Sequence, residues 1–142
     1  MRAVACRAAA RLGRRGAYLL VAGVGWLLYG VGVIQDPRVG TVRAAVVLSE
    51  AAPLSWWGGL WIACGAVAIV TAWSRCPLKQ TAGYAAAMLP PLLWATAYAA
   101  AWLLGEYPRA WTGAATWAGA AGKLLIVAGW PEPARVPEVA RE

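Results

Sequence analysis

The chain alternates long apolar stretches with short charged ones, and this alternation is its main structural signal. Four stretches of at least twenty residues carry no charge or a single one, and they lie at residues 16–35, 51–74, 80–105 and 110–131. About 20 apolar residues in a helix cross the hydrocarbon core of a bilayer. We therefore expect an all-α integral membrane bundle of four transmembrane helices, with spans at about 16–35, 53–74, 81–104 and 110–130.

Two polar segments flank this transmembrane domain of residues 16–131. Residues 1–15 carry five arginines and no acid, so we expect a basic cytoplasmic segment lying on anionic lipid. A cleaved secretory signal is the alternative, but the apolar run is long and no small-residue cleavage site follows it before Asp36. Residues 132–142 combine prolines with alternating charges, which predicts a disordered cytoplasmic tail.

The basic residues are distributed unevenly across the predicted bundle. Four spans put both termini on one side, which then holds nine Lys and Arg residues against three on the other side. Membrane proteins keep their more basic loops in the cytoplasm. The sequence therefore predicts a multi-pass protein of the cell's inner (cytoplasmic) membrane, with both termini cytoplasmic.

The composition agrees with a membrane protein and argues against other classes. Apolar residues make up 61% of the 142 residues and charged residues 13%, where soluble proteins have about 25% charged residues. The net charge of +7 does not indicate nucleic acid binding, because the basic residues lie between apolar stretches. Cys6, Cys64 and Cys76 have no close spacing and histidine is absent, so we expect neither a disulfide framework nor a metal site.

Small residues recur at helical spacing in the first and fourth stretches. Gly16, Gly23 and Gly30 lie seven residues apart, on nearly one face of a helix, where another backbone can approach closely. Gly119 and Gly122 belong to a second small-residue surface. We expect helix packing at these glycines and a homo-oligomer formed through the first-span strip; the alternative is that they reflect the general frequency of glycine in membrane helices.

Pro90-Pro91 and Lys123 are the disruptive features inside the spans. Each proline removes a backbone donor, so we expect the third helix to be broken there, either as a packed static kink or as a gating hinge. Lys123 lies seven residues before Trp130, about 10 Å from the cytoplasmic end of its span. Its long stem favours an ammonium that snorkels to the interface, and the alternative is a functional role facing a wet interior.

The chain offers no convergent set of reactive groups, so we expect no enzyme and no cofactor. It has no Cys-x-x-Cys pair, and Gly122-Lys123 lacks the rest of a phosphate-binding loop. Its acidic residues all fall at the edges of the spans or outside them. A proton-coupled transporter is therefore not expected.

Short apolar patterns resemble a class of small membrane proteins. They are the segment 14–20 (RRGAYLL), Gly25-Trp26, Leu89-Pro90-Pro91 and the ending 129–133 (GWPEP). In these the chain resembles small four-span membrane proteins of actinobacteria and their phages, some of which are called holin-like. The resemblance implies a phage holin-like oligomer that permeabilises the membrane in host lysis. The alternative is a structural or accessory protein that binds another membrane component.

Overall fold

The computed structural model is all-helical in the part of the chain that it describes, residues 2–36, 48, 52–74 and 76–131. Side chains are described from Leu12 onward. The helices are α1 (Arg2–Gln35), α4 (Leu54–Ala72), α5 (Pro77–Leu103) and α6 (Ala110–Ala128). The predicted tail, residues 132–142, lies outside the described residues.

Three segments are long and apolar enough to cross a membrane: Leu12–Gln35, Leu54–Ala72 and Pro77–Leu103. The expectation of an all-α membrane protein is confirmed to that extent. α6 has 19 residues, as α4 does, but it carries Lys123 and several glycines and threonines, and it does not reach the same hydropathy. The fourth span is therefore not confirmed.

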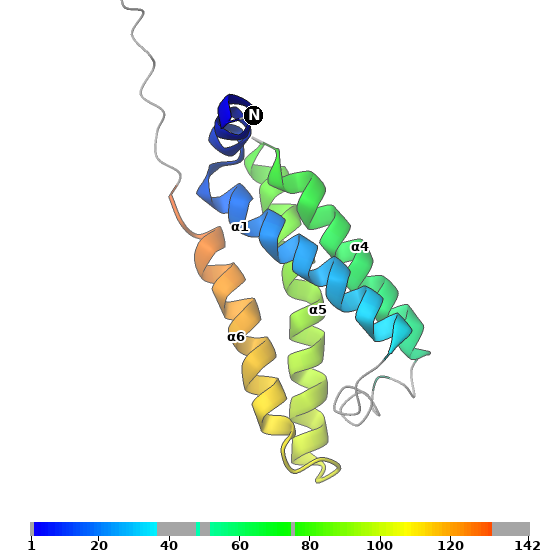
Figure 1. Ribbon diagram of the computed structural model, residues 1–142. Coiled ribbons are helices and arrows are strands. Elements are labelled where there is room, and N and C mark those ends of the chain that lie inside the picture. The colour runs from blue at the N-terminus through cyan, green and yellow to red at the C-terminus, as the bar shows by residue number, and fades with distance from the viewer. Residues whose placement is uncertain (1, 37–47, 49–51, 75, 132–142) are drawn as a thin grey trace, which may run out of the picture.

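α1 changes direction at Gly13. This residue has φ 67° and ψ 175°, a backbone conformation that is essentially restricted to glycine. Figure 1 shows the first turns of α1, in dark blue, turned away from the axis of the rest of the helix. The arginine-rich segment is helical, as its alanines favour, and Gly13 separates its direction from that of the first span.

α5 is one helix from Pro77 to Leu103, with Pro90 and Pro91 inside it. The break that the two prolines predict is therefore not confirmed. The helix also begins earlier than the expected span, because Pro77 lies at its first position, where a fixed φ and a missing N–H are no disadvantage.

The helices form two antiparallel pairs, α1 with α4 and α5 with α6, which are inclined to each other (Figure 1). α4 and α5 join the pairs, whereas α1 and α6 touch at only a few points. The span of α1 begins, and α6 ends, at the same end of the bundle (Figure 1). A groove between α1 and α6 can therefore open along one side of the molecule.

α1 and α4 pack through small residues on both helices. The facing pairs are Gly16 with Ala72, Gly23 with Gly65, and Gly30 with Gly58. A Cβ added to any of these three glycines of α1 would lie within 2.8 Å of a carbonyl oxygen of α4. The strip expected to join copies of the chain thus packs inside a single copy.

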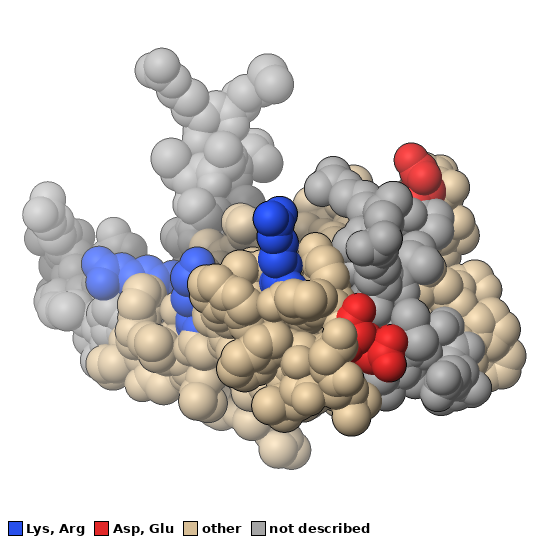
Figure 2. All heavy atoms as spheres, turned by 90° about the horizontal axis from the view of Figure 1, so that it is seen from below, with Lys and Arg blue, Asp and Glu red and all other residues tan. Residues whose placement is uncertain are grey.

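The outer surface of the described helices is largely apolar. Val21, Leu28, Val70, Leu103 and Ile126 are all more than 60% exposed. A lipid-facing exterior has this character, since hydrocarbon does not solvate charge. Figure 2 looks from below onto the end of the bundle where α5 ends and α6 begins, and it shows few and separated charged side chains there.

Candidate functional site

Six aromatic side chains from all four helices meet at the centre of the bundle. They are Trp26 and Tyr29 of α1, Trp57 and Trp61 of α4, Trp94 of α5, and Trp117 of α6. Trp61 is fully buried, and four of the other rings lie within 5.4 Å of its own, centroid to centroid. Edge-to-face pairs of this kind contribute about 0.5–1.5 kcal/mol beyond the burial of their area. This aromatic cluster joins the two helix pairs.

The indole N–H of Trp61 is buried without a hydrogen-bond partner among the described residues. Aromatic faces are weak acceptors for such groups, and the ring of Trp94 stands at 83° to that of Trp61. The position is enclosed by rings rather than open to a ligand.

Trp26 makes the polar contact that explains how α5 stays continuous at its prolines. In a regular helix the N–H of residue 91 would donate to the carbonyl of Ala87, but Pro91 has no N–H. The indole Nε1–H of Trp26 donates to that carbonyl instead, at 2.9 Å. A buried carbonyl without a donor costs about 1–3 kcal/mol. A side chain of α1 thus replaces the missing backbone bond of α5.

Tyr84 ties the same two helices together nearer the start of the span. Its hydroxyl donates to the carbonyl of Arg15 at 2.8 Å, and the guanidinium carbon of Arg15 lies 5.6 Å from the centre of its ring. Tyr84 is 2% exposed. Arg15, at the start of the first span, is therefore anchored to α5.

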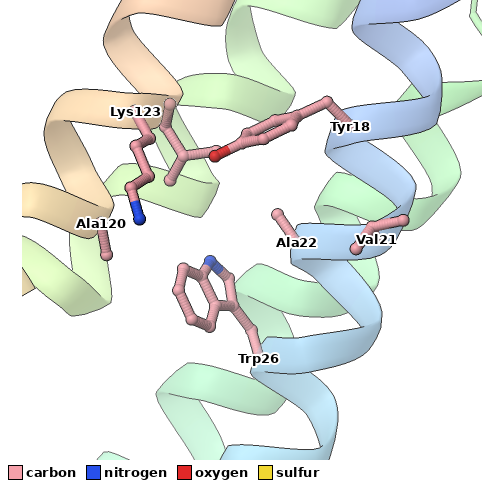
Figure 3. A pocket seen from close by; sticks show the side chains of 7 residues that line it. Tyr18, Val21, Ala22, Trp26, Ala120 and Lys123 are labelled. Atoms are coloured by element: carbon pink, nitrogen blue, oxygen red, sulfur yellow. The ribbon is translucent and has the colours of Figure 1, made fainter.

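A cavity of about 230 Å³ lies between α1 and α6. Its lining is mostly apolar and consists of Tyr18, Val21, Ala22, Trp26, Ala120, Lys123 and Leu124. Figure 3 shows Lys123 extending from α6 into the space between Tyr18 and Trp26 of α1. We call this cavity the Lys123 groove.

The other residues singled out from the sequence lie apart from this groove or beside it. Pro90 and Pro91 are buried in α5. Gly119 and Gly122 have no atom within 4 Å of an added Cβ, so they pack against no other described helix. Lys123 is an exposed residue at the rim of the groove.

The described residues include two cysteines and no cluster of metal-ligating side chains. No three side chains among their His, Cys, Asp and Glu come together as a metal site. Cys64 is buried and Cys76 exposed, and both are free. Backbone N–H groups of Lys79 and Leu78 donate to the Cys76 sulfur and lower the pKa of the thiol. Cys76 is thus the more reactive of these two thiols.

Three comparisons with known proteins leave the site to be judged from its own geometry. The chain matches no family model, no curated protein and no solved structure.

Sequence reasoning missed the residues at the bundle centre. The more exposed tryptophans, Trp56, Trp73, Trp111 and Trp130, instead lie near the ends of the apolar stretches. The signal for the central ones was their depth, because Trp26, Trp61, Trp94 and Trp117 lie near the middle of their stretches. The glycines of α4 also carried a signal, since Gly58 and Gly65 repeat the seven-residue spacing of α1.

Proposed function

We propose that the chain is a four-span protein of the cytoplasmic membrane with both termini in the cytoplasm. α6 supplies the fourth span, because it is as long as α4 and lies alongside α5 (Figure 1). The excess of basic residues on the side of the termini supports the orientation.

Cys76 provides a test of this topology. In a Cys6→Ser background we expect a membrane-impermeant maleimide to label Cys76 in inside-out vesicles and not in intact spheroplasts. Because hydrogen bonds lower the pKa of this thiol, the reactive thiolate persists to lower pH. Labelling in the vesicles should reach half its maximal rate at a lower pH than the labelling of a free thiol in water does. Labelling of Cys76 in intact spheroplasts would show that the orientation is the opposite of the one proposed.

Two added cysteines test α6 itself, in a chain with Cys6 and Cys76 replaced by serine. Glu106→Cys lies in the turn before α6, and Pro131→Cys lies just after it. If α6 crosses the membrane, spheroplasts should expose the first and protect the second. Equal labelling of the two cysteines would show that α6 does not cross the membrane.

The function we propose is permeabilisation of the membrane by an oligomer, as in holin-like proteins of phages. One observation carries it: no described atom lies within 4 Å of a Cβ added at Gly119 or Gly122, which are three residues apart on α6, whereas Gly16, Gly23 and Gly30 pack against α4. Small residues let helix backbones approach each other in lipid. Copies of the chain would associate through this face of α6, and no catalytic step is involved.

Induction in a bacterial host with a membrane-potential dye tests this function. We expect depolarisation after accumulation, and lysis when an endolysin is co-expressed. Gly119→Leu with Gly122→Leu should reduce both cross-linked oligomer and depolarisation. The matched control is Gly32→Leu, at another glycine with nothing within 4 Å of its added Cβ, which should behave as wild type. Growth at full potential with endolysin present would reject permeabilisation.

An accessory role is the second candidate, favoured by the Lys123 groove. α1 and α6 barely touch beside it, so the groove leaves room for a component from outside the chain. A stable complex with a host membrane protein, together with an intact membrane potential, would support this role instead.

A further inference from the structure

The Lys123 groove combines one cation with an apolar slot. Val21, Ala22, Ala120 and Leu124 contribute hydrocarbon, and Tyr18 and Lys123 contribute polar groups. Figure 3 shows the Lys123 ammonium and the Tyr18 hydroxyl directed toward the same space. The third polar group of the lining, the Trp26 indole N–H, already donates to the carbonyl of Ala87. A ligand for this groove is therefore an amphiphile with an acceptor-rich head.

The charge balance around the groove favours an anionic head. Asp36 and Glu106 are the acidic residues that the structure describes, and they lie beyond the end of α1 and before the start of α6, far along both helices from Lys123. Among the described residues nothing forms an ion pair with Lys123. Arg14 and Arg15 begin the first span at the end of the bundle where α6 finishes, so this end is basic.

Depth and size both fit a phospholipid. Lys123 lies five residues before the last residue of α6, about 8 Å along the axis, and its stem brings the ammonium nearer the interface. The volume of about 230 Å³ exceeds that of an apolar cavity of about 150 Å³ that takes up benzene. A segment of acyl chain therefore fits while the head lies at phosphate depth.

We propose that the Lys123 groove binds an anionic phospholipid, with its phosphate at Lys123 and Tyr18 and an acyl segment along Val21, Trp26 and Leu124. Basic pockets between membrane helices on the cytoplasmic side bind such headgroups. The proposal rests on α6 being a span, as proposed above, but not on oligomer formation or permeabilisation. It places a bound lipid between the two helix pairs, where it would cover the side on which α1 and α6 make few contacts.

Native mass spectrometry of the full chain in detergent tests the proposal, with phosphatidylglycerol and phosphatidylcholine added separately. We expect retention of phosphatidylglycerol over phosphatidylcholine. Lys123→Gln should lower that retention about fivefold, the effect of one basic residue near an anionic lipid, and Lys123→Arg should restore it. Lys79→Gln, at an exposed lysine near the same end, is the matched control and should change nothing.

A steric variant tests the apolar part of the Lys123 groove separately from the charge of Lys123. Ala120→Trp fills the groove while keeping Lys123, and it should also lower retention. Equal retention of the two lipids, or of phosphatidylglycerol by the wild type and Lys123→Gln, would overturn the proposal. A dimer that Lys123→Gln dissociates would also overturn it, since a second copy of the chain would then occupy the groove.

Replacing Glu132, Glu138 and Glu142 by glutamine should leave the retention of phosphatidylglycerol unchanged. A rise in retention would show that the tail, rather than a lipid, pairs with Lys123. The labelling of Pro131→Cys reports separately on whether α6 spans the membrane.

Discussion

Gly23→Leu is expected to prevent the chain from giving a stable, monodisperse protein in mild detergent. A Cβ at position 23 would lie 2.8 Å from the carbonyl oxygen of Gly65 and 3.1 Å from the Cβ of Ala68. Neither atom is the free end of a flexible side chain, so α1 and α4 must separate. Extra methylene groups in a packed core cost about 1–3 kcal/mol, and an isobutyl group between two backbones costs more.

Gly25→Leu is the matched control for this substitution. Gly25 lies on the same helix two residues away, and an added Cβ there meets nothing within 4 Å. Size-exclusion chromatography and thermal unfolding of both variants give the comparison, with Gly25→Leu expected near the wild type. If the two variants unfold at the same temperature, α1 does not pack on α4 through its glycines.

Trp26→Phe is expected to destabilise the bundle by about 1–3 kcal/mol, because it leaves the carbonyl of Ala87 without a donor. Phenylalanine keeps an aromatic ring beside Trp61 but loses the N–H that reaches this carbonyl at 2.9 Å. The free energy of unfolding in mixed micelles is the measurement. Part of any loss comes from the smaller ring, so the single variant does not isolate the bond.

Pro91→Ala isolates it through a double-mutant cycle. An alanine at position 91 returns the N–H that a regular helix would offer to Ala87. Trp26→Phe should then cost less in the Pro91→Ala background than in the wild type, with a coupling of about 1 kcal/mol or more. Equal costs in the two backgrounds would show that Trp26 does not replace the bond missing at Pro91.

The spans were predictable because hydrophobic length is a local property of the chain. Leu54–Ala72 lies within a run without charge, and Pro77–Leu103 covers most of the uncharged run 80–105 together with Lys79 near its start. α6 was harder, because Lys123 lowers its hydropathy although the helix is as long as α4. Mean hydropathy counts every residue of α6 equally, whereas the packing of the helix depends on which face each residue occupies.

The contacts were less predictable because they depend on pairing between distant segments. The strip Gly16, Gly23 and Gly30 identified a close-packing face, but not whether its partner was α4 or a second copy. Pro90-Pro91 predicted carbonyls without donors, yet not that Trp26, sixty-one residues from Ala87 along the chain, would supply one. The Lys123 groove likewise needs α1 and α6 together before it exists.

The glycine pairing also bears on the alignment of α1 against α4. Both helices repeat small residues every seven positions, so a slide of seven residues, about 10 Å along the axis, would restore two of the three pairs. Backbone contacts of this repeating kind do not distinguish one alignment from the next. Groups that occur once do, namely Trp26 bonded to Ala87 and Tyr84 bonded to Arg15. These two bonds fix the position of α1 along α5. Because α4 packs on both helices, the same bonds also select one of the possible alignments of α1 against α4.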